Sequence, residues 1–271
     1  MVLIYIMQNV HIYTIPKSII IIYDKSKIIL PEKFRKIIEE NWNLLRKQGK
    51  NFFQGDVYAI SKLESSYNNL TIHLKLSNYA HYIYTIYNKP PIELCCRVVY
   101  TCALVETIDG HFVFGEMANH TSTPKRLQCA GGGIENSDIK GDFVDLNNNI
   151  KRELFEEMGI DINDKSITLE SFPKYLKTGG SNNFISIIFK VKLSINKKEM
   201  QNLYKKHIND FLTKGVFSEF SSLVFVRSNP SSVKYFLTKD RRQRVDYLKS
   251  LLEIETGMNN VQIYLEEDDN W

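Results

Sequence analysis

Three glutamates stand at positions that place their carboxylates on one side of a helix. Glu153, Glu156 and Glu157 are spaced i, i+3 and i+4, and apolar residues recur every fourth position from Ile150 to Met158. Such a helix has an apolar stripe to bury and an acidic side to present. Carboxylates this close repel one another, and a hard divalent cation with oxygen ligands relieves the repulsion. The spacing therefore predicts a site for the kind of cation that phosphate-transfer chemistry uses.

The residues around these glutamates resemble the Nudix signature. The run Arg152 to Ile160 reads Arg-Glu-apolar-any-Glu-Glu-any-Gly-apolar and matches the second half of that signature at every fixed position. Upstream, residues 130–135 resemble the glycine loop of the family, with Gly132 as the signature glycine. Asp138 stands where the family has its first glutamate.

The spacer between Asp138 and Arg152 has thirteen residues, about six more than the family usually has. This insertion leaves Asp138, Asp142 and Asp145 as alternatives for the first signature acid. Asp145 and the asparagines at 147–149 favour caps and turns over helix interiors. We therefore predict a loop excursion, with the helix beginning near residues 145–149.

The resemblance implies metal-dependent hydrolysis of a diphosphate linkage, with Mg²⁺ as the cofactor and Mn²⁺ as a substitute. Glu153, Glu156 and Glu157 would be the metal ligands, and the Gly131 carbonyl would add a backbone ligand, since glycines permit close approach of the chain. Arg152 would orient the neighbouring glutamates by ion pairing. A phosphate clamp is the alternative role for this arginine.

Two residues are candidates for the general base that accepts a proton from water. Glu153 lies within the signature, and Glu219 precedes a predicted strand at 223–226, where several Nudix families place a late carboxylate. The alternative for Glu219 is an ordinary exposed loop acid. Arg126, Gly132 and Gly133 are candidates for binding substrate phosphates, and an ordinary charged turn at 125–126 is the alternative for Arg126.

The signature resemblance indicates the diphosphate and not the groups attached to it. A nucleoside diphosphate sugar, including ADP-ribose, is the first expectation for this small-molecule substrate. A dinucleotide, a noncanonical nucleoside triphosphate or an RNA cap is the alternative substrate, and a non-catalytic nucleotide-sensing Nudix module is the alternative function. A cap hydrolase should have a basic, aromatic-lined groove. A DNA-binding regulator should have a basic recognition helix, and no such helix is evident before residue 90.

The composition is that of a soluble protein with a sizeable core. The 271 residues are 43% hydrophobic. A chain of this length is long for a single Nudix domain and predicts an extra element. A net charge of +4 is a weak basic bias, so nucleic acid is not an expected partner. The four cysteines and six histidines have no zinc-site spacing, and no apolar run is long enough for a membrane span. We expect a cytoplasmic protein with free thiols.

The pattern of elements predicts an α/β (α+β) fold in two parts. Residues 1–90 form an N-terminal α/β extension for substrate binding or dimerisation, with strands at 19–22, 56–60 and 70–76 and a helix from Pro31 to Gly49. Residues 91–271 form a Nudix-type mixed sheet between helices, ending in a C-terminal helix. We expect a loop at 177–183 and a largely helical segment at 232–255, whose solvent face carries Lys239, Arg241, Arg242 and Arg244.

Overall fold

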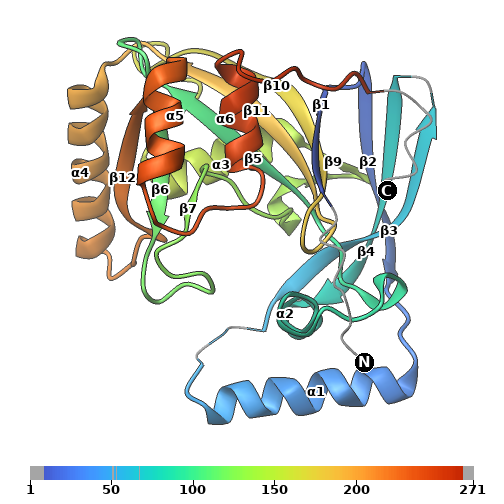
Figure 1. The fold of residues 1–271 in the computed structure, drawn as a ribbon. Helices are drawn as coiled ribbons and strands as arrows, with labels where there is room; N and C mark the ends of the chain where they lie inside the picture. Colours follow the sequence, from blue (N-terminus) through green and yellow to red (C-terminus); the bar gives the residue numbers. More distant parts are fainter. Residues whose placement is uncertain (1–8, 51, 53, 67, 265–271) are drawn as a thin grey trace.

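The computed structural model describes residues 9–50, 52, 54–66 and 68–264, and it has an α+β fold built on two sheets (Figure 1). The larger sheet is mixed, since β5 and β11 are parallel and its other paired strands are antiparallel. Its order is β1 (Val10–Thr14), β10 (Thr168–Gly179), β11 (Ile185–Leu193), β5 (Val99–Glu106), β6 (His111–Met117) and β12 (Phe220–Arg227), with β7 (Leu127–Gln128) beside β6.

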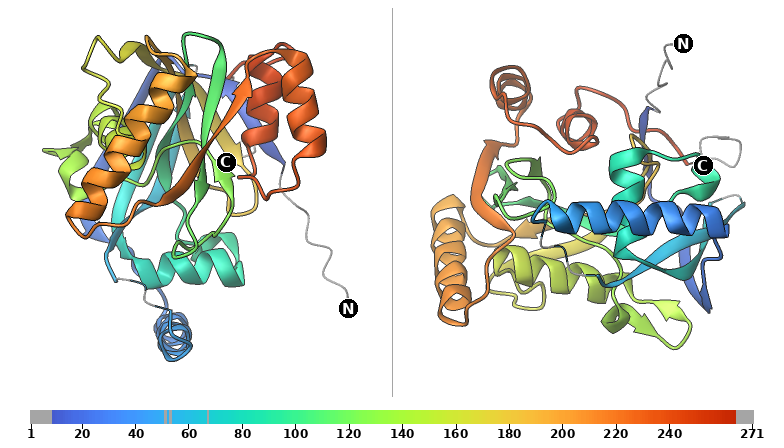
Figure 2. Two further views of the ribbon diagram at one scale, coloured as in Figure 1. Left: turned by 90° about the vertical axis from the view of Figure 1, so that its left-hand side faces the viewer. Right: turned by 90° about the horizontal axis from the view of Figure 1, so that it is seen from below.

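Helices cover both faces of the larger sheet (Figure 2). On one face α3 (Leu146–Met158) and α4 (Lys197–Thr213) bury apolar side chains against Val99, Ala103 and Val105 of β5. On the other face α5 (Pro230–Lys239) and α6 (Leu248–Glu255) pack against Cys102 and Leu104 of the same strand. The alternation along β5 follows from the two-residue period of a strand and confirms the predicted sheet between helices.

The second sheet joins the N-terminal segment to the signature spacer. Its order is β3 (Asp56–Ser66), β4 (Asn69–Asn78), β2 (Ser18–Lys27), β9 (Phe143–Val144) and β8 (Ile139–Lys140). The Tyr23 amide donates to the Asp142 carbonyl at 2.8 Å, and Ile22 pairs with Phe143. The spacer is thus a hairpin fastened to β2 and not only the loop that we expected. Strand β1, from residues 1–90, joins the larger sheet, and β8–β9, from residues 91–271, join the smaller one. Each sheet thus contains strands from both predicted parts, and the division at residue 90 stays a prediction.

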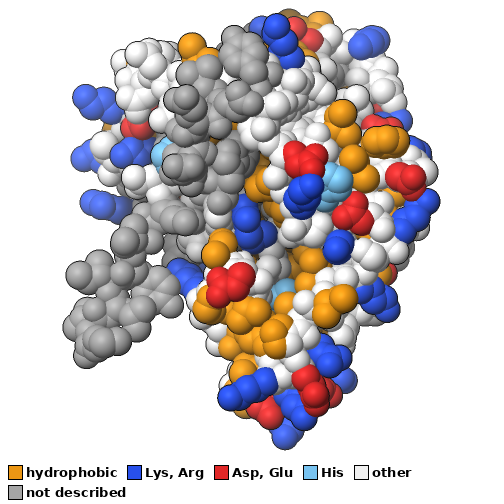
Figure 3. Space-filling view, turned by 90° about the vertical axis from the view of Figure 1, so that its right-hand side faces the viewer, with side chains coloured by type: hydrophobic (Ala, Val, Ile, Leu, Met, Phe, Trp, Pro, Cys, Tyr) orange, Lys and Arg blue, Asp and Glu red, His pale blue; other side chains and the backbone are white. Residues whose placement is uncertain are grey.

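The described N-terminal helices form an aromatic layer beside the smaller sheet. Helix α1 (Glu32–Lys47) buries Phe34, Ile38 and Trp42 toward α2 (Tyr79–Asn88), as its helical spacing predicts. The ring centroids of Trp42 and Phe52 lie 6.3 Å apart. On the face seen in Figure 3, side chains of both charges lie among exposed hydrophobic ones. None of the helices in the described residues is long and apolar enough to cross a membrane.

Two predicted elements are wrong in part. Strand β10 continues to Gly179, so the predicted loop at 177–183 is shorter. The segment 232–255 is two helices separated by residues 240–247, and its charged side chains do not share one solvent face. Arg242 instead forms ion pairs with Asp240 and with Glu116 at 2.6 Å, and the Arg244 guanidinium lies 4.9 Å from the centroid of the Phe236 ring. These contacts bring the segment back to the larger sheet.

Candidate active site on helix α3

Helix α3 begins and ends where the sequence predicts. Asp145 caps its N-terminus by accepting a hydrogen bond from the Asn148 amide at 3.0 Å. Gly159 ends it in the left-handed conformation at a φ of 72°, which glycine adopts without strain. The predicted start near residues 145–149 is confirmed.

The acidic side of α3 turns toward the glycine loop. Glu153 and Glu157 are buried, at 8% and 4% exposure, whereas Glu156 is exposed. The Gly131 amide donates to the Glu157 carboxylate at 2.6 Å. A side-chain carbon on Gly132 would overlap the Glu153 carboxylate. The glycines therefore allow the loop to approach two buried acids.

Burial and mutual repulsion disfavour the charged forms of these acids. Burial raises the pKa of Glu153 to about 8; Arg152 opposes the rise, and the charges of Glu156 and Glu219 add to it. Burial, followed by the charges of Glu153 and Glu219, also raises the pKa of Glu157 well above its usual value, and the Gly131 amide opposes this rise. A divalent cation would stabilise the ionised carboxylates, so the donor set fits Mg²⁺ or Mn²⁺.

Arg152 is the centre of an ion-pair network. Its guanidinium lies 2.8 Å from Glu153, 3.2 Å from Glu156 and 3.1 Å from Asp138. It also donates to the Gly133 carbonyl at 3.2 Å. Burial alone would lower the pKa of Arg152, but Glu153 and Asp138 raise it above its ordinary value. These contacts are those expected of an arginine that orients the glutamates.

The contacts of Arg152 and of the Gly131 amide hold the carboxylates away from a metal-binding arrangement. Among the described residues, no group of three or more histidine, cysteine, aspartate or glutamate side chains is arranged to hold an ion. Arg152 engages Glu153 and Glu156, and the Gly131 amide engages Glu157. Metal binding would therefore require these carboxylates to exchange partners.

The three aspartates of the spacer have different surroundings. Asp138 is completely buried and accepts a hydrogen bond from Arg152 at 3.1 Å. Asp142 is exposed and forms an ion pair with Lys25 of β2. Asp145 caps α3. Of the three, only Asp138 contacts the signature arginine in the described part of the chain.

Asn149 is a site residue that sequence reasoning treated only as a turn former. It is fully buried and donates to Asp138 at 2.9 Å and to the Gly133 carbonyl at 2.8 Å. Its side-chain oxygen accepts a hydrogen bond from Thr101 of β5. Its place four residues before Glu153 was a usable signal, because it puts both side chains on one side of the helix.

Glu219 and Arg126 lie outside α3, and the charge of Glu219 acts on the acids of α3. Glu219 precedes β12 and is exposed, as expected for the alternative of a loop acid, and its charge contributes to the raised pKa of Glu153 and of Glu157. Burial among surrounding atoms raises the pKa of Glu219 itself; His120 opposes the rise and Glu156 adds to it. Arg126 donates to Gln128 at 2.6 Å. The charge of the exposed Glu219 thus acts on the acids of α3, and its role as base stays a prediction.

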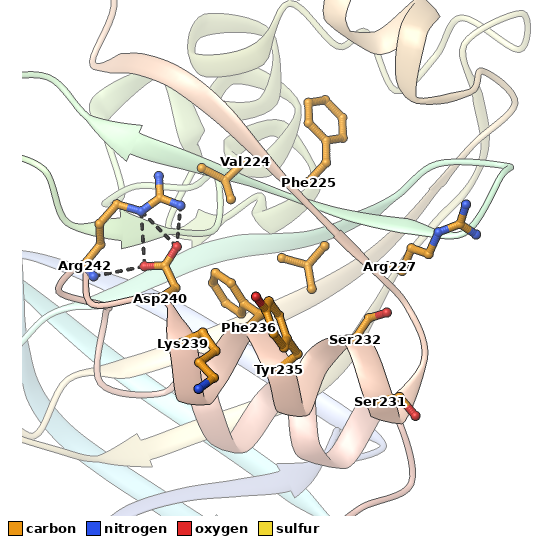
Figure 4. A pocket seen from close by; sticks show the side chains of 11 residues that line it. Val224, Phe225, Arg227, Ser231, Ser232, Tyr235, Phe236, Lys239, Asp240 and Arg242 are labelled. Carbon is orange, nitrogen blue, oxygen red and sulfur yellow. Dashed lines mark hydrogen bonds and ion pairs between the residues drawn. The ribbon is translucent and has the colours of Figure 1, made fainter.

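A separate hollow of about 620 Å³ lies between β12 and α5 (Figure 4). Its lining includes Phe225, Tyr235 and Arg242, and Arg242 points to Asp240. None of the signature acids lines it. It is therefore distinct from the candidate active site.

The chain matches no family model and no curated protein. Among solved structures it is similar to a Nudix hydrolase from Nitrosomonas europaea, with 14% identity and a TM-score of 0.35 over 65% of this chain and 99% of that chain. It is similar to the MutT protein from Methanosarcina mazei Go1, with 12% identity and a TM-score of 0.35 over 60% and 96%.

A third similar structure is a bifunctional NMN adenylyltransferase/ADP ribose pyrophosphatase from Francisella tularensis, complexed with AMP and a manganese ion. Here the identity is 15% and the TM-score 0.36, over 60% of this chain and 42% of that chain. The solved structures to which the chain is similar thus include Nudix hydrolases, the family whose signature its sequence resembles.

Proposed function

We propose that this chain is a Nudix pyrophosphohydrolase that cleaves a diphosphate linkage in a nucleoside diphosphate derivative. The observation that carries the proposal is the pair of buried glutamates, Glu153 and Glu157, held against a glycine loop beside the Arg152 network. Burying a carboxylate costs folding free energy, and carboxylates with raised pKa values cluster at functional sites. The function that we assign to these carboxylates is to hold a divalent cation beside the substrate phosphates.

The cation ligands in this proposal are Glu153, Glu156 and Glu157, with the Gly131 carbonyl as a backbone donor. When bound, Mg²⁺ or Mn²⁺ supplies positive charge for the phosphate oxygens and activates water as a Lewis acid. Arg152 would orient the glutamates through its ion pairs. These ion pairs would hold the glutamates beside one another until the cation replaces the arginine as their partner.

Proton transfer and phosphate binding are assigned to neighbouring residues. Glu219 accepts the proton of the attacking water in this proposal, and Glu153 is the alternative base. Desolvation raises the pKa of Glu219, the direction that makes a carboxylate a stronger proton acceptor. Arg126 and the backbone amides of Gly132 and Gly133 would bind the phosphate oxygens.

A nucleoside diphosphate sugar such as ADP-ribose is the substrate class that we favour. The test is a hydrolysis screen over nucleotide sugars, dinucleotides and nucleoside triphosphates with Mg²⁺, in which the products are identified. We expect a nucleoside monophosphate and a sugar phosphate from the best substrate. Absence of metal-dependent cleavage across the whole screen would overturn the proposal and favour a nucleotide-sensing module.

A further inference from the structure

Helix α2 presents two tyrosines whose rings form one aromatic surface. Tyr79 and Tyr82 are half-buried, and their ring centroids lie 5.5 Å apart. The Tyr82 ring also stacks on Phe184, which precedes β11, at 5.7 Å and 19°. We call these three rings the aromatic wall. A wall of this kind binds flat, apolar faces, and the protein core does not fully cover it.

The loop between β6 and β7, residues 118–126, brings unpaired polar groups to the aromatic wall. Within the described residues, the Arg126 Nε and the Thr123 Oγ1 are buried and have no hydrogen-bond partner. The charge of Arg126 acts on Tyr82, and Ser122 of the loop is hydrogen-bonded to Tyr79. A buried donor without a partner costs free energy, so a ligand that supplies an acceptor gains by binding there.

The aromatic wall lies close to the glycine loop of the candidate active site. Burial raises the pKa of both Tyr79 and Tyr82, and the charge of Glu219 adds to each rise. The Glu219 carbonyl accepts a hydrogen bond from the Ala118 amide at 2.7 Å, where the 118–126 loop begins. Tyr100 of β5 packs in one cluster with Tyr82 and Phe184 and pairs with Gly133 of the glycine loop. The aromatic wall is therefore next to the glycine loop, whose Gly131 amide donates to Glu157.

The attachment of the N-terminal segment fixes the aromatic wall in place. The Ile60 amide of β3 donates to the Arg97 carbonyl at 2.7 Å, just before β5. The Tyr79 amide, at the start of α2, donates to the Gly55 carbonyl at 2.9 Å. With the spacer hairpin paired to β2, these bonds hold α2 beside the active site before substrate arrives. Preorganisation of this kind lowers the entropy cost of binding.

We propose that Tyr79 and Tyr82 of α2, together with Arg126, bind the nucleoside monophosphate half of the substrate. The nucleobase lies on the tyrosine rings, because every base has a flat face that stacks on aromatic side chains. The adjoining phosphate accepts hydrogen bonds from Arg126. The inference rests on the proposed function and assigns the N-terminal segment to nucleoside recognition.

The test measures binding by isothermal titration calorimetry in excess EDTA, so that no turnover occurs. The probes are AMP and ribose 5-phosphate, which lacks a base. We expect Tyr79→Leu to weaken AMP binding about 10-fold and to leave ribose 5-phosphate binding unchanged. Tyr79→Phe should bind AMP within about 2-fold of wild type, because the ring is retained. Arg126→Gln should weaken both probes.

Two controls separate binding from folding. Tyr235→Leu changes an exposed tyrosine of α5 and should bind AMP like wild type. If Tyr79→Leu does not fold, photolabelling of wild type with 8-azido-AMP replaces it, and the label should be found in the peptide that contains residues 79–88. Label found only in other peptides would refute the inference.

Other outcomes are equally decisive. Absence of AMP binding to wild type, equal affinity for AMP and ribose 5-phosphate, or unchanged AMP binding in folded Tyr79→Leu would overturn the inference. Tyr79-dependent AMP binding without hydrolysis in the substrate screen would remove the proposed function and leave the nucleoside site. Hydrolysis without Tyr79-dependent AMP binding would remove the nucleoside site and leave the proposed function.

Discussion

Glu153 should destabilise the metal-free protein as the pH rises from about 4.5 to about 8. Burial is the main cause that raises its folded pKa from 4.5 to about 8, so the folded state prefers the neutral acid. A raised folded pKa gives stability that is fully present below 4.5 and is lost as the pH rises through about 8. The difference corresponds to at most about 4 to 5 kcal/mol, at about 1.4 kcal/mol for each pH unit.

The substitution Glu153→Gln isolates this effect. Glutamine has nearly the same shape and no charge, and Arg152 retains its ion pairs with Asp138 and Glu156. We expect the variant and wild type to have similar stability at pH 5, where both side chains are neutral in the folded state. At pH 9 the variant should be more stable by about 2 kcal/mol or more, because wild type must then bury a charge.

The assay is urea unfolding in EDTA at pH 5, 7 and 9, followed by circular dichroism. Glu39→Gln, an exposed change in α1, is the matched control and should follow wild type at each pH. Mg²⁺ should stabilise wild type at pH 8 more than it stabilises Glu153→Gln. Wild-type stability that does not fall between pH 5 and 9 relative to the variant would refute the reasoning.

Three further substitutions test the surroundings of Glu153. Asp138→Asn breaks the buried ion pair with Arg152 and should lower the free energy of unfolding by about 2 to 4 kcal/mol, measured in urea; an unchanged midpoint would show that the pair is unimportant. Gly132→Ala should displace the Glu153 carboxylate and lower kcat about 10²-fold, whereas wild-type kcat would contradict the close approach. Glu219→Gln should lower kcat about 10² to 10⁴-fold; wild-type turnover from pH 6 to 9 would leave Glu153 as the base.

The sequence predicts α3 well because its signals are local. The apolar period, the cap at Asp145 and the terminal glycine all lie within fifteen residues. Helix α2 was missed because Tyr79–Asn88 is rich in aromatic and β-branched residues, which favour strands. Its one local signal is Asn78, which caps the helix by accepting from the His81 amide at 3.0 Å.

The remaining differences come from contacts between distant segments. Residues 240–247 have helix-forming side chains, yet the Gln243 carbonyl accepts from the Leu127 amide at 2.8 Å and the Val245 amide donates back to the Leu127 carbonyl. Pairing with β7 therefore overrides local preference. The burial of Asp138 likewise depends on a spacer hairpin that pairs with β2, more than a hundred residues earlier. No local pattern reports such a contact.

Turnover of the best nucleoside diphosphate substrate tests most directly whether α3 carries a catalytic cation site. The measurement compares wild type with Glu157→Gln, and Mg²⁺ with excess EDTA, at saturating substrate. We expect monophosphate products from wild type only with Mg²⁺, and a kcat lower by about 10²-fold or more for folded Glu157→Gln. Equal turnover in EDTA, or wild-type kcat in Glu157→Gln, would contradict a metal site on α3.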